Sequence, residues 1–426
     1  MDEKLIWLWL SLHFGAGSTL YEKLYTHFGS VGAIFDSDDA DVEPLDFLNS
    51  SQKRKLLDKN TDHAKEVMEW CDDNGVSVIA FSDVNYPSPL KSLPNFPAVL
   101  YCKGTLPDFE SDLCIAVVGT RKMTAYGQKN AYELGFGLAK GGAVVVSGMA
   151  LGIDCTAQKG CLYAGGRTVA VLGSGIDIVY PKENTELFDK IILNGAVITE
   201  YAPGTPPAGT NFPVRNRIIS GLCRGTVVVE ADINSGSMIT AKTTINQGRE
   251  LFAVPGPVRT FTSGGTNQLI RDGAHVVTGA VDIVEQFLDS YPDKIDISGS
   301  KMRPVFKKPL KVASYRDMDG FYSGASDAQN VDKNRDYENE VKRGNKILKS
   351  GENKGNVNGE DKNRFDPSSL SPNERKLYDS LEYEKPVTID EMRVDGMDIS
   401  DISATVTMLE IAGAIEAIPG GLYIKK

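Results

Sequence analysis

The chain has 426 residues, of which 41% are hydrophobic and 24% charged, and these values predict a sizeable core and more than one domain. The formal net charge of −11 disfavours general attraction to polyanions, so any nucleic-acid site must be a local basic patch. Six scattered cysteines without a CxxC pair indicate a reducing compartment. No stretch approaches the roughly 18 apolar residues of a membrane span. We therefore expect a cytoplasmic protein without membrane association.

Residues 1–75 have apolar positions at helical spacing and predict a small helical domain. Its first stretch, "LIWLWLSLHF", follows Asp2 and Glu3 and is expected to be a folded helix rather than a secretory signal. The next, "FGAGSTLYEKLYTHFGS", resembles a helix-hairpin-helix or SAM-like unit, whose glycine-rich turn can hold a DNA backbone. Because this segment has few lysines or arginines, a packing module is the favoured interpretation.

Residues 76–290 alternate short apolar runs with helical segments, which predicts a Rossmann-like α/β domain with a doubly wound, mostly parallel sheet. Several runs are apolar at consecutive positions, as expected when helices cover both faces of the sheet. The expected strands are "VSVIAF", "AVLYCKG", "CIAVVG", "AVVVSG", "TVAVLG", "AVITEY", "TVVVEA", "LFAVPG" and "AHVVTG".

Residues 291–367 are rich in Lys, Asp, Asn, Gly and Ser, and this composition predicts a disordered linker. Residues 368–426 regain helical and strand patterns and end in a "AIEAIPGGLYIKK" hairpin, which predicts a winged-helix domain. No Lys or Arg occurs between Arg393 and Lys425, so an acidic recognition helix would repel phosphates. We expect this domain to have a protein-interaction or regulatory role.

Ligands of an open parallel sheet bind beyond the carboxyl ends of its strands, where glycine turns and helix N-termini collect. Glycine-containing turns follow "CIAVVG", "AVVVSG" and "TVAVLG", and Gly173 and Gly175 fit a phosphate-binding turn best. Each glycine is equally compatible with a simple tight turn. Neither GxGxxG with its acidic partner nor GxxxxGK[ST] occurs, so the usual dinucleotide and Walker sites are not indicated.

Cations from separate segments are expected to meet at this edge. Arg121 follows the first glycine turn, Lys182 follows the third, and Arg215 and Arg217 precede "TVVVEA". Together with Phe212 they predict a pocket with a basic rim for a polyphosphate with a stacked base.

Catalytic patterns are weak. The four histidines have no zinc-ligand spacing and no neighbouring nucleophile, and Ser147 lies outside a GxSxG elbow. Asp154, Glu200 and Glu230 could supply carboxylates, yet each is equally explained as a helix cap, an arginine partner or a strand-end anchor. No acid–base pair can be named from spacing alone, and we expect neither a cofactor nor a metal.

Long segments of the chain resemble one family. "AVVGTRKMTAYG", "VVSGMALGIDCTAQKG", "NFPVRNRIISGLCRGTVVVEA" and "GTNQLIRDGAHVV" occur in order and are similar to the DprA/Smf family of DNA-processing proteins, over about residues 75–290. The resemblance implies a homodimer that binds single-stranded DNA, protects it and assists loading of the RecA recombinase in natural transformation and homologous recombination. It implies no catalytic turnover, so the protein is expected not to be an enzyme. The implied DNA-binding residues are Gly119, Arg121, Ser147, Gly148, Gly173, Gly175, Lys182, Phe212, Arg215, Asn216, Arg217 and, less firmly, Lys242.

The chain departs from this family at Gln158, where His is common, and at Thr120, where Ser is frequent. Two other hypotheses remain open. One is an enzyme that resembles the nucleotide phosphoribohydrolases, although Ala241 and Lys242 replace the carboxylate that such chemistry needs. The other is a nucleotide sensor that uses the same pocket.

Overall fold

The computed structural model describes residues 2–258 and 260–304, residue 370, residues 372–383 and short stretches between residues 387 and 425. The chain divides into two compact units, Met1–Asp327 and Ala328–Lys426.

A nine-stranded sheet organises the first unit, with the strand order β1-β2-β6-β5-β4-β3-β7-β8-β9. Strands β3 to β9 pair in parallel, while β1 and β2 are antiparallel to their neighbours. All nine strands coincide with the predicted apolar runs, and the α/β fold class is confirmed. The strands are β1 (Ser77–Ala80), β2 (Val99–Gly104), β3 (Cys114–Val118), β4 (Val144–Ser147), β5 (Thr168–Val171), β6 (Gly195–Thr199), β7 (Gly225–Val228), β8 (Glu250–Ala253) and β9 (His275–Val276).

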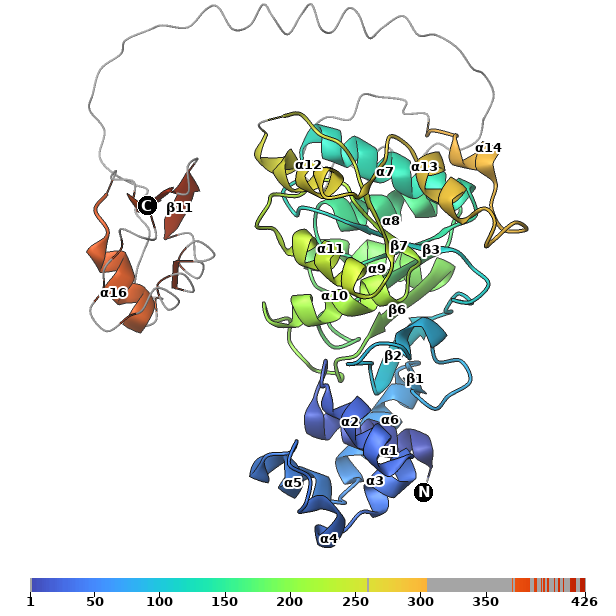
Figure 1. Cartoon of the computed structure of the whole chain (residues 1–426), viewed down its shortest axis with the longest axis vertical. Helices are drawn as coiled ribbons and strands as arrows, with labels where there is room; N and C mark the ends of the chain where they lie inside the picture. The colour runs from blue at the N-terminus through green and yellow to red at the C-terminus, as the bar shows by residue number, and fades with distance from the viewer. Residues whose placement is uncertain are drawn as a thin grey trace, which may run out of the picture. The chain divides into compact units, whose positions relative to one another are not determined.

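Helices cover both faces of the sheet (Figure 1). Alternate residues of β3 show this: Ile115 and Val117 pack with α7, α8 and α13, whereas Ala116 and Val118 share a core with α9, α10 and α11. The continuous burial of β3 therefore reflects two covered faces, as the sequence predicts. The helices are α7 (Ala125–Lys140), α8 (Ile153–Tyr163), α9 (Thr185–Asn194), α10 (Asn211–Gly221), α11 (Gly236–Asn246), α12 (Gly264–Arg271) and α13 (Ala280–Val284), with 3-10 turns η1 (Ser88–Leu90), η2 (Lys182–Asn184), η3 (Phe261–Ser263) and η4 (Glu285–Phe287).

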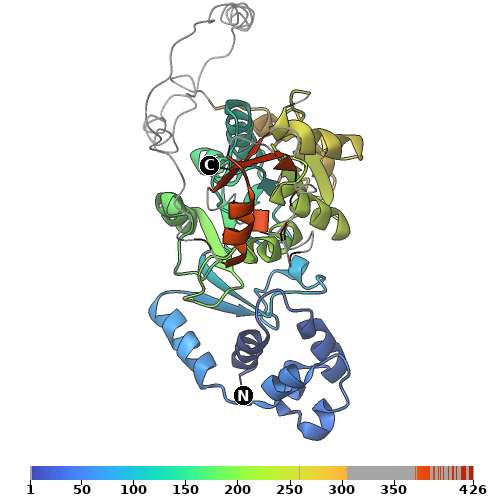
Figure 2. The same cartoon turned by 90° about the vertical axis from the view of Figure 1, so that its left-hand side faces the viewer.

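The predicted N-terminal helices lie beyond β1 and β2 in both views (Figure 2). Their core is continuous with that of the sheet, since fully buried Trp7 packs against Phe81, which stacks on Phe96 with ring centroids 4.1 Å apart. The domain boundary at residue 75 stays a prediction, because the helices and the sheet belong to one compact unit. The helices are α1 (Glu3–Phe14), α2 (Leu20–Phe28), α3 (Val31–Asp36), α4 (Asp39–Val42), α5 (Ser50–Leu57) and α6 (Asp62–Asp73).

The predicted linker starts too early. Residues 291–304 are folded: Tyr291 is buried in the core, and α14 (Ile297–Ser300) packs against α7. Composition misled here because one buried aromatic and a short helix need few large aliphatic residues. The remainder of the predicted linker, residues 305–367, lies outside the described residues.

The second unit contains α16 (Pro372–Ser380) and a three-stranded sheet of order β10-β12-β11. The predicted hairpin is present, since β11 (Ile415–Ile418) pairs with β12 (Leu422–Lys425), and β10 (Val387–Thr388) adds to its edge. A separate small core includes Leu377, Tyr378 and Leu409.

Candidate nucleic-acid interface

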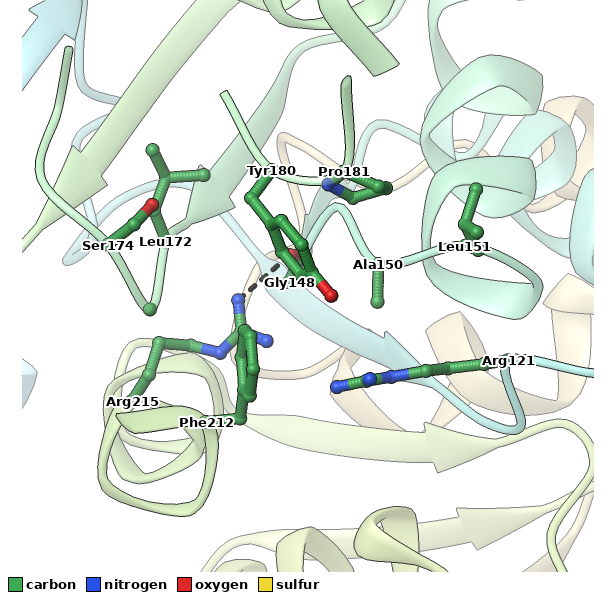
Figure 3. Close-up of a pocket in the computed structure, with 11 residues that line it drawn as sticks. Arg121, Gly148, Ala150, Leu151, Leu172, Ser174, Tyr180, Pro181, Phe212 and Arg215 are labelled. Carbon is green, nitrogen blue, oxygen red and sulfur yellow. Dashed lines mark hydrogen bonds between the residues drawn. The ribbon is translucent and has the colours of Figure 1, made fainter. Parts of the chain in front are cut away.

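A small pocket of about 50 Å³ lies at the carboxyl ends of β3, β4 and β5 (Figure 3). The turns after the three strands form part of its wall, and α10 and the segment before η2 complete it. The lining residues are Arg121, Gly148, Ala150, Leu151, Leu172, Gly173, Ser174, Tyr180, Pro181, Phe212 and Arg215.

Phe212, in the first turn of α10, lies close to two guanidinium groups. The central guanidinium carbons of Arg121 and Arg215 lie 4.9 Å and 5.8 Å from the centre of its ring. The Tyr180 ring lies 5.8 Å away at an interplanar angle of 31°. Gly173 makes room for this group, because a Cβ there would come within 2.9 Å of the Phe212 ring. The site therefore combines two cations with two aromatic rings.

Arg215 is only 4% exposed, and its guanidinium group is fixed by hydrogen bonds to neighbouring residues. Its Nη1 donates to the carbonyl oxygens of Gly148, at 2.8 Å, and Val171. Its Nε donates to Oδ1 of Asn216 at 3.1 Å. Burial lowers the pKa of Arg215 to about 10, and the negative charge of Asp154 opposes that shift. Neutral carbonyls thus fix the guanidinium without cancelling its charge.

Gly148 begins the turn between β4 and α8. A Cβ on Gly148 would lie 2.5 Å from Nη2 of Arg215, so the arginine occupies space that only glycine leaves open. The next residue, Met149, has a φ of 52°, which is unusual for a residue with a side chain. Asn184 fixes this turn by donating to the Met149 carbonyl at 2.7 Å. Such a strained turn needs support from its surroundings, and strain of this kind is concentrated at functional sites.

Arg121 and Lys182 are exposed cations at this edge. Among residues 2–258 and 260–304, neither forms an ion pair. Arg121 extends from the turn after β3 toward Phe212 (Figure 3). Lys182 follows the pocket residue Pro181 at the start of η2, but it does not line the pocket itself. Both charges are available to an anion.

The predicted position of Arg217 in the basic rim is wrong. Arg217 is 5% exposed, and its Nη2 is hydrogen-bonded to Oε2 of buried Glu200. The reason is helical geometry: α10 turns by about 200° over two residues, so Arg215 and Arg217 face opposite sides. Reading "NFPVRNRIISG" as a helix instead of a loop would have separated them.

Four of the remaining predicted residues contribute to turns or packing. The Ser147 hydroxyl is buried and donates to the Val117 carbonyl at 2.6 Å. A Cβ on Gly119 would meet the Ile153 side chain at 2.6 Å, and one on Gly175 would meet Asp177 at the same distance. Asn216 reaches the site only through its bond with Arg215.

Lys242 and the two departures from the family pattern lie outside the pocket lining. Lys242 is exposed on α11. Gln158 is fully buried on α8, where its Nε2 donates to the Val169 carbonyl at 3.1 Å. Thr120 receives the Ile153 backbone N–H at 3.2 Å through its own carbonyl.

The three candidate carboxylates have structural partners. Asp154, in the first turn of α8, accepts the Gly148 N–H at 3.2 Å, and burial raises the pKa of its carboxyl. Glu200 is an arginine partner. Glu230 lies just beyond β7 and accepts from the N–H of Thr124 at 2.9 Å. Each carboxylate therefore has a structural explanation, although Asp154 bonds the turn before α8 and does not cap the helix.

Sequence reasoning missed the apolar wall and the second aromatic ring of the pocket. Tyr180 is 43% exposed although it is aromatic, and it stands two residues before Lys182. The sequence could have indicated Tyr180, because an aromatic residue near a cation favours binding of stacked bases. Ala150, Leu151 and Leu172 gave no comparable signal.

The fold and this site define a Rossmann-like protein with a cationic, aromatic pocket at the carboxyl edge of its sheet. The family model described as DNA recombination-mediator protein A matches residues 77–288, and the DprA winged helix domain matches residues 362–421. The chain belongs to this DprA/Smf family of DNA-processing proteins, which confirms the resemblance inferred from the sequence and the winged-helix prediction.

Two relatives and a solved structure support this assignment, and their matches cover different shares of this chain. Protein Smf of Synechocystis is 29% identical over 430 residues, which is 100% of this chain and 99% of the relative. DNA processing protein DprA of Bacillus subtilis is 41% identical over 214 residues, or 50% of this chain and 72% of the relative. The X-ray structure of DprA from Streptococcus pneumoniae has a TM-score of 0.58 and 31% identity, and the match covers 67% of this chain and 98% of that one.

No helix within the described part of the chain is long and apolar enough to cross a membrane. In the same residues, no group of three or more His, Cys, Asp and Glu side chains is placed to hold a metal ion.

Proposed function

We propose that this protein binds single-stranded DNA in the pocket around Phe212. The proximity of the Phe212 ring to the guanidinium groups of Arg121 and Arg215 carries the proposal. Unpaired bases stack on aromatic and guanidinium planes, and the phosphates between them are attracted to cations such as exposed Lys182. Affinity from such contacts depends little on sequence and strongly on salt.

We further propose that the bound strand is protected and passed to the RecA recombinase in natural transformation and homologous recombination. The family description as a recombination mediator and the relatives named DNA processing protein support this role. A protein partner needs an accessible surface, and α11 exposes Ile239 by 49% and Ile245 by 58%. These accessible apolar side chains are candidate contacts for a protein partner.

A homodimer is part of the same proposal. The outer strand β9 forms the edge of the nine-stranded sheet, and both of its residues are exposed, with Val276 at 49%. These exposed side chains are accessible to a second copy, although a strand of two residues offers little backbone for pairing.

The enzymatic alternative has less support. No carboxylate lines the pocket among the described residues, and Ala241 is buried on α11 while Lys242 points outward. A glycosidic-bond cleavage would need an acid or base within reach of the substrate. A sensor for a single nucleotide would use the same pocket residues, so it differs from the proposal only in the length of ligand that binds.

Replacing Arg121 with alanine tests the proposal. We expect Arg121→Ala to weaken binding of a thymidine oligonucleotide by about tenfold or more, because both a charge and a stacking partner are removed. Filter binding across a range of salt concentrations measures the loss, and the salt slope should fall by about one counterion unit. The matched control is Lys190→Ala, which removes one exposed charge from α9, away from the pocket.

Equal affinities of the Arg121→Ala and Lys190→Ala variants would contradict the pocket assignment. A mononucleotide that binds as tightly as the oligonucleotide would favour the sensor. Release of a free base from a nucleoside monophosphate would favour the enzyme.

A further inference from the structure

The side of α10 that faces away from the pocket is tied to the N-terminal helices. Arg217 on this side is hydrogen-bonded to Oε2 of Glu200, whose other oxygen accepts the backbone N–H of Gly17 at 3.0 Å. The charged side chains are 6% and 3% exposed. One carboxylate at the end of β6 thus joins α10 to the turn between α1 and α2.

A second contact joins the same two parts of the chain. Gly17 has a φ of +74°, and a Cβ on it would lie 2.6 Å from Cγ1 of Val214. The turn can approach α10 this closely because Gly17 has no side chain. Its glycine-rich segment therefore packs against the chain's own helix, and the Gly17 N–H that a DNA phosphate would use is already bonded to Glu200.

These contacts set the rotation of α10. Phe212 and Arg215 are three residues apart and share one side of the helix, while Arg217 lies about 200° from Arg215. A rotation that disturbed the Arg217–Glu200 pair would therefore also move Phe212 and Arg215 in the pocket.

Stability alone does not explain the buried Arg217–Glu200 pair. Nε and Nη1 of Arg217 are buried without a hydrogen-bond partner among the described residues, so part of the cost of desolvating the guanidinium is not recovered. Buried ion pairs can often be replaced by apolar residues without loss of stability, and their best-attested use is to select one arrangement.

We propose that Glu200 is a positioning residue for the single-stranded-DNA site, acting through Arg217 and Gly17 to fix the orientation of α10. The N-terminal helices thereby contribute to DNA affinity without contacting DNA. This inference rests on the proposed function, since it assigns a role at the same pocket.

A double-mutant cycle on DNA binding tests the proposal. Glu200→Gln keeps the shape of the side chain but removes the charge that holds Arg217, and Phe212→Ala removes the stacking ring. We expect Glu200→Gln to weaken binding of a thymidine oligonucleotide about tenfold in the wild-type background and by less than about twofold in the Phe212→Ala background. An abasic oligonucleotide, which cannot stack, should bind the wild-type and Glu200→Gln proteins within about twofold of each other.

Two controls separate positioning from a general loss of stability. Glu186→Gln makes the same charge change on exposed α9 and should leave affinity unchanged. Leu56→Ala creates a cavity at a fully buried position of α5, and should lower the unfolding temperature without changing affinity at a temperature where the protein is folded. Melting curves of all variants establish that temperature.

The possible outcomes are distinct. Additive effects of Glu200→Gln and Phe212→Ala, or an equal loss for abasic and thymidine oligonucleotides, would overturn the positioning role while leaving the DNA site in place. A loss in Leu56→Ala equal to that in Glu200→Gln would also overturn it. Wild-type affinity in Phe212→Ala would instead contradict the proposed function.

Discussion

Two places at the carboxyl edge of the sheet differ in how they treat negative charge. The pocket over β3, β4 and β5 presents Arg121 and Arg215 around an aromatic ring. The neighbouring crevice between β3 and β7, where the strand order reverses, contains Glu230 at the N-terminus of α7. Its carboxylate accepts the N–H and the hydroxyl of Thr124, at 2.9 Å and 2.5 Å.

The comparison shows why topology alone would point to a different place from the proposed DNA site. In doubly wound folds the reversal point is the usual binding crevice, and a phosphate there is stabilised by a helix N-terminus. In this chain Glu230 fills that position, and a Cβ on Gly127 would lie only 2.0 Å from its Oε2. Glu230 already occupies the N-terminus of α7, which makes the adjacent pocket the better candidate for an external polyanion.

The largest effect is expected from a substitution in the pocket that changes no charge. Gly148→Ala places a Cβ 2.5 Å from Nη2 of Arg215, so the guanidinium must leave its carbonyl partners. We expect oligonucleotide affinity to fall by about tenfold or more, because the arginine no longer faces Phe212. Filter binding measures the affinity. The control is Gly165→Ala, which also leaves the charge unchanged and adds a Cβ that meets no atom within 4 Å.

Gly165 has a φ of +77°, so the control carries its own backbone strain and reports on stability alone. Wild-type affinity in Gly148→Ala would show that the position of Arg215 does not matter for binding.

The corresponding substitution in the crevice should affect folding instead of binding. Gly127→Ala forces Glu230 away from the N-terminus of α7, and overpacking of this kind lowers the free energy of unfolding by about 1–3 kcal/mol. Urea denaturation measures the loss. Oligonucleotide affinity of the folded variant should stay within about twofold of wild type, and a selective loss of affinity would mean that the crevice also contacts DNA.

The strands and the covered faces of the sheet were predictable because they depend on local apolar runs. "CIAVVG" and "TVVVEA" are apolar at consecutive positions, and only a strand with two covered faces requires that in such short runs. The predicted linker begins too early because composition describes long segments. One buried residue, Tyr291, and the four-residue helix α14 change that composition too little to be recognised.

The sequence predicts only part of the site, because the positions of cations along the chain do not show where each side chain points. Arg121, Phe212 and Arg215 meet as expected. Arg217 does not, since two positions along a helix reverse the side, and its partner Glu200 is distant from any arginine-rich motif. The contact of Gly17 with Glu200 joins residues 183 positions apart, and no local pattern predicts it.

The smallest effect concerns the buried acid beneath the pocket. Burial raises the pKa of Asp154 above its ordinary value, while the positive charge of Arg215 opposes the shift. The folded state therefore binds more protons than the unfolded state between the two pKa values, so the contribution of this group to stability is present at low pH and is lost as the pH rises through the folded-state pKa.

Asp154→Asn removes that loss. We expect the variant to gain stability relative to wild type as the pH rises from acidic to neutral, when urea denaturation is measured at each pH. The control is Asp189→Asn, the same change at an exposed position of α9. A stability difference that is independent of pH would mean that the Asp154 carboxyl is already satisfied by its backbone donors, and that the charge of Arg215 is not linked to it.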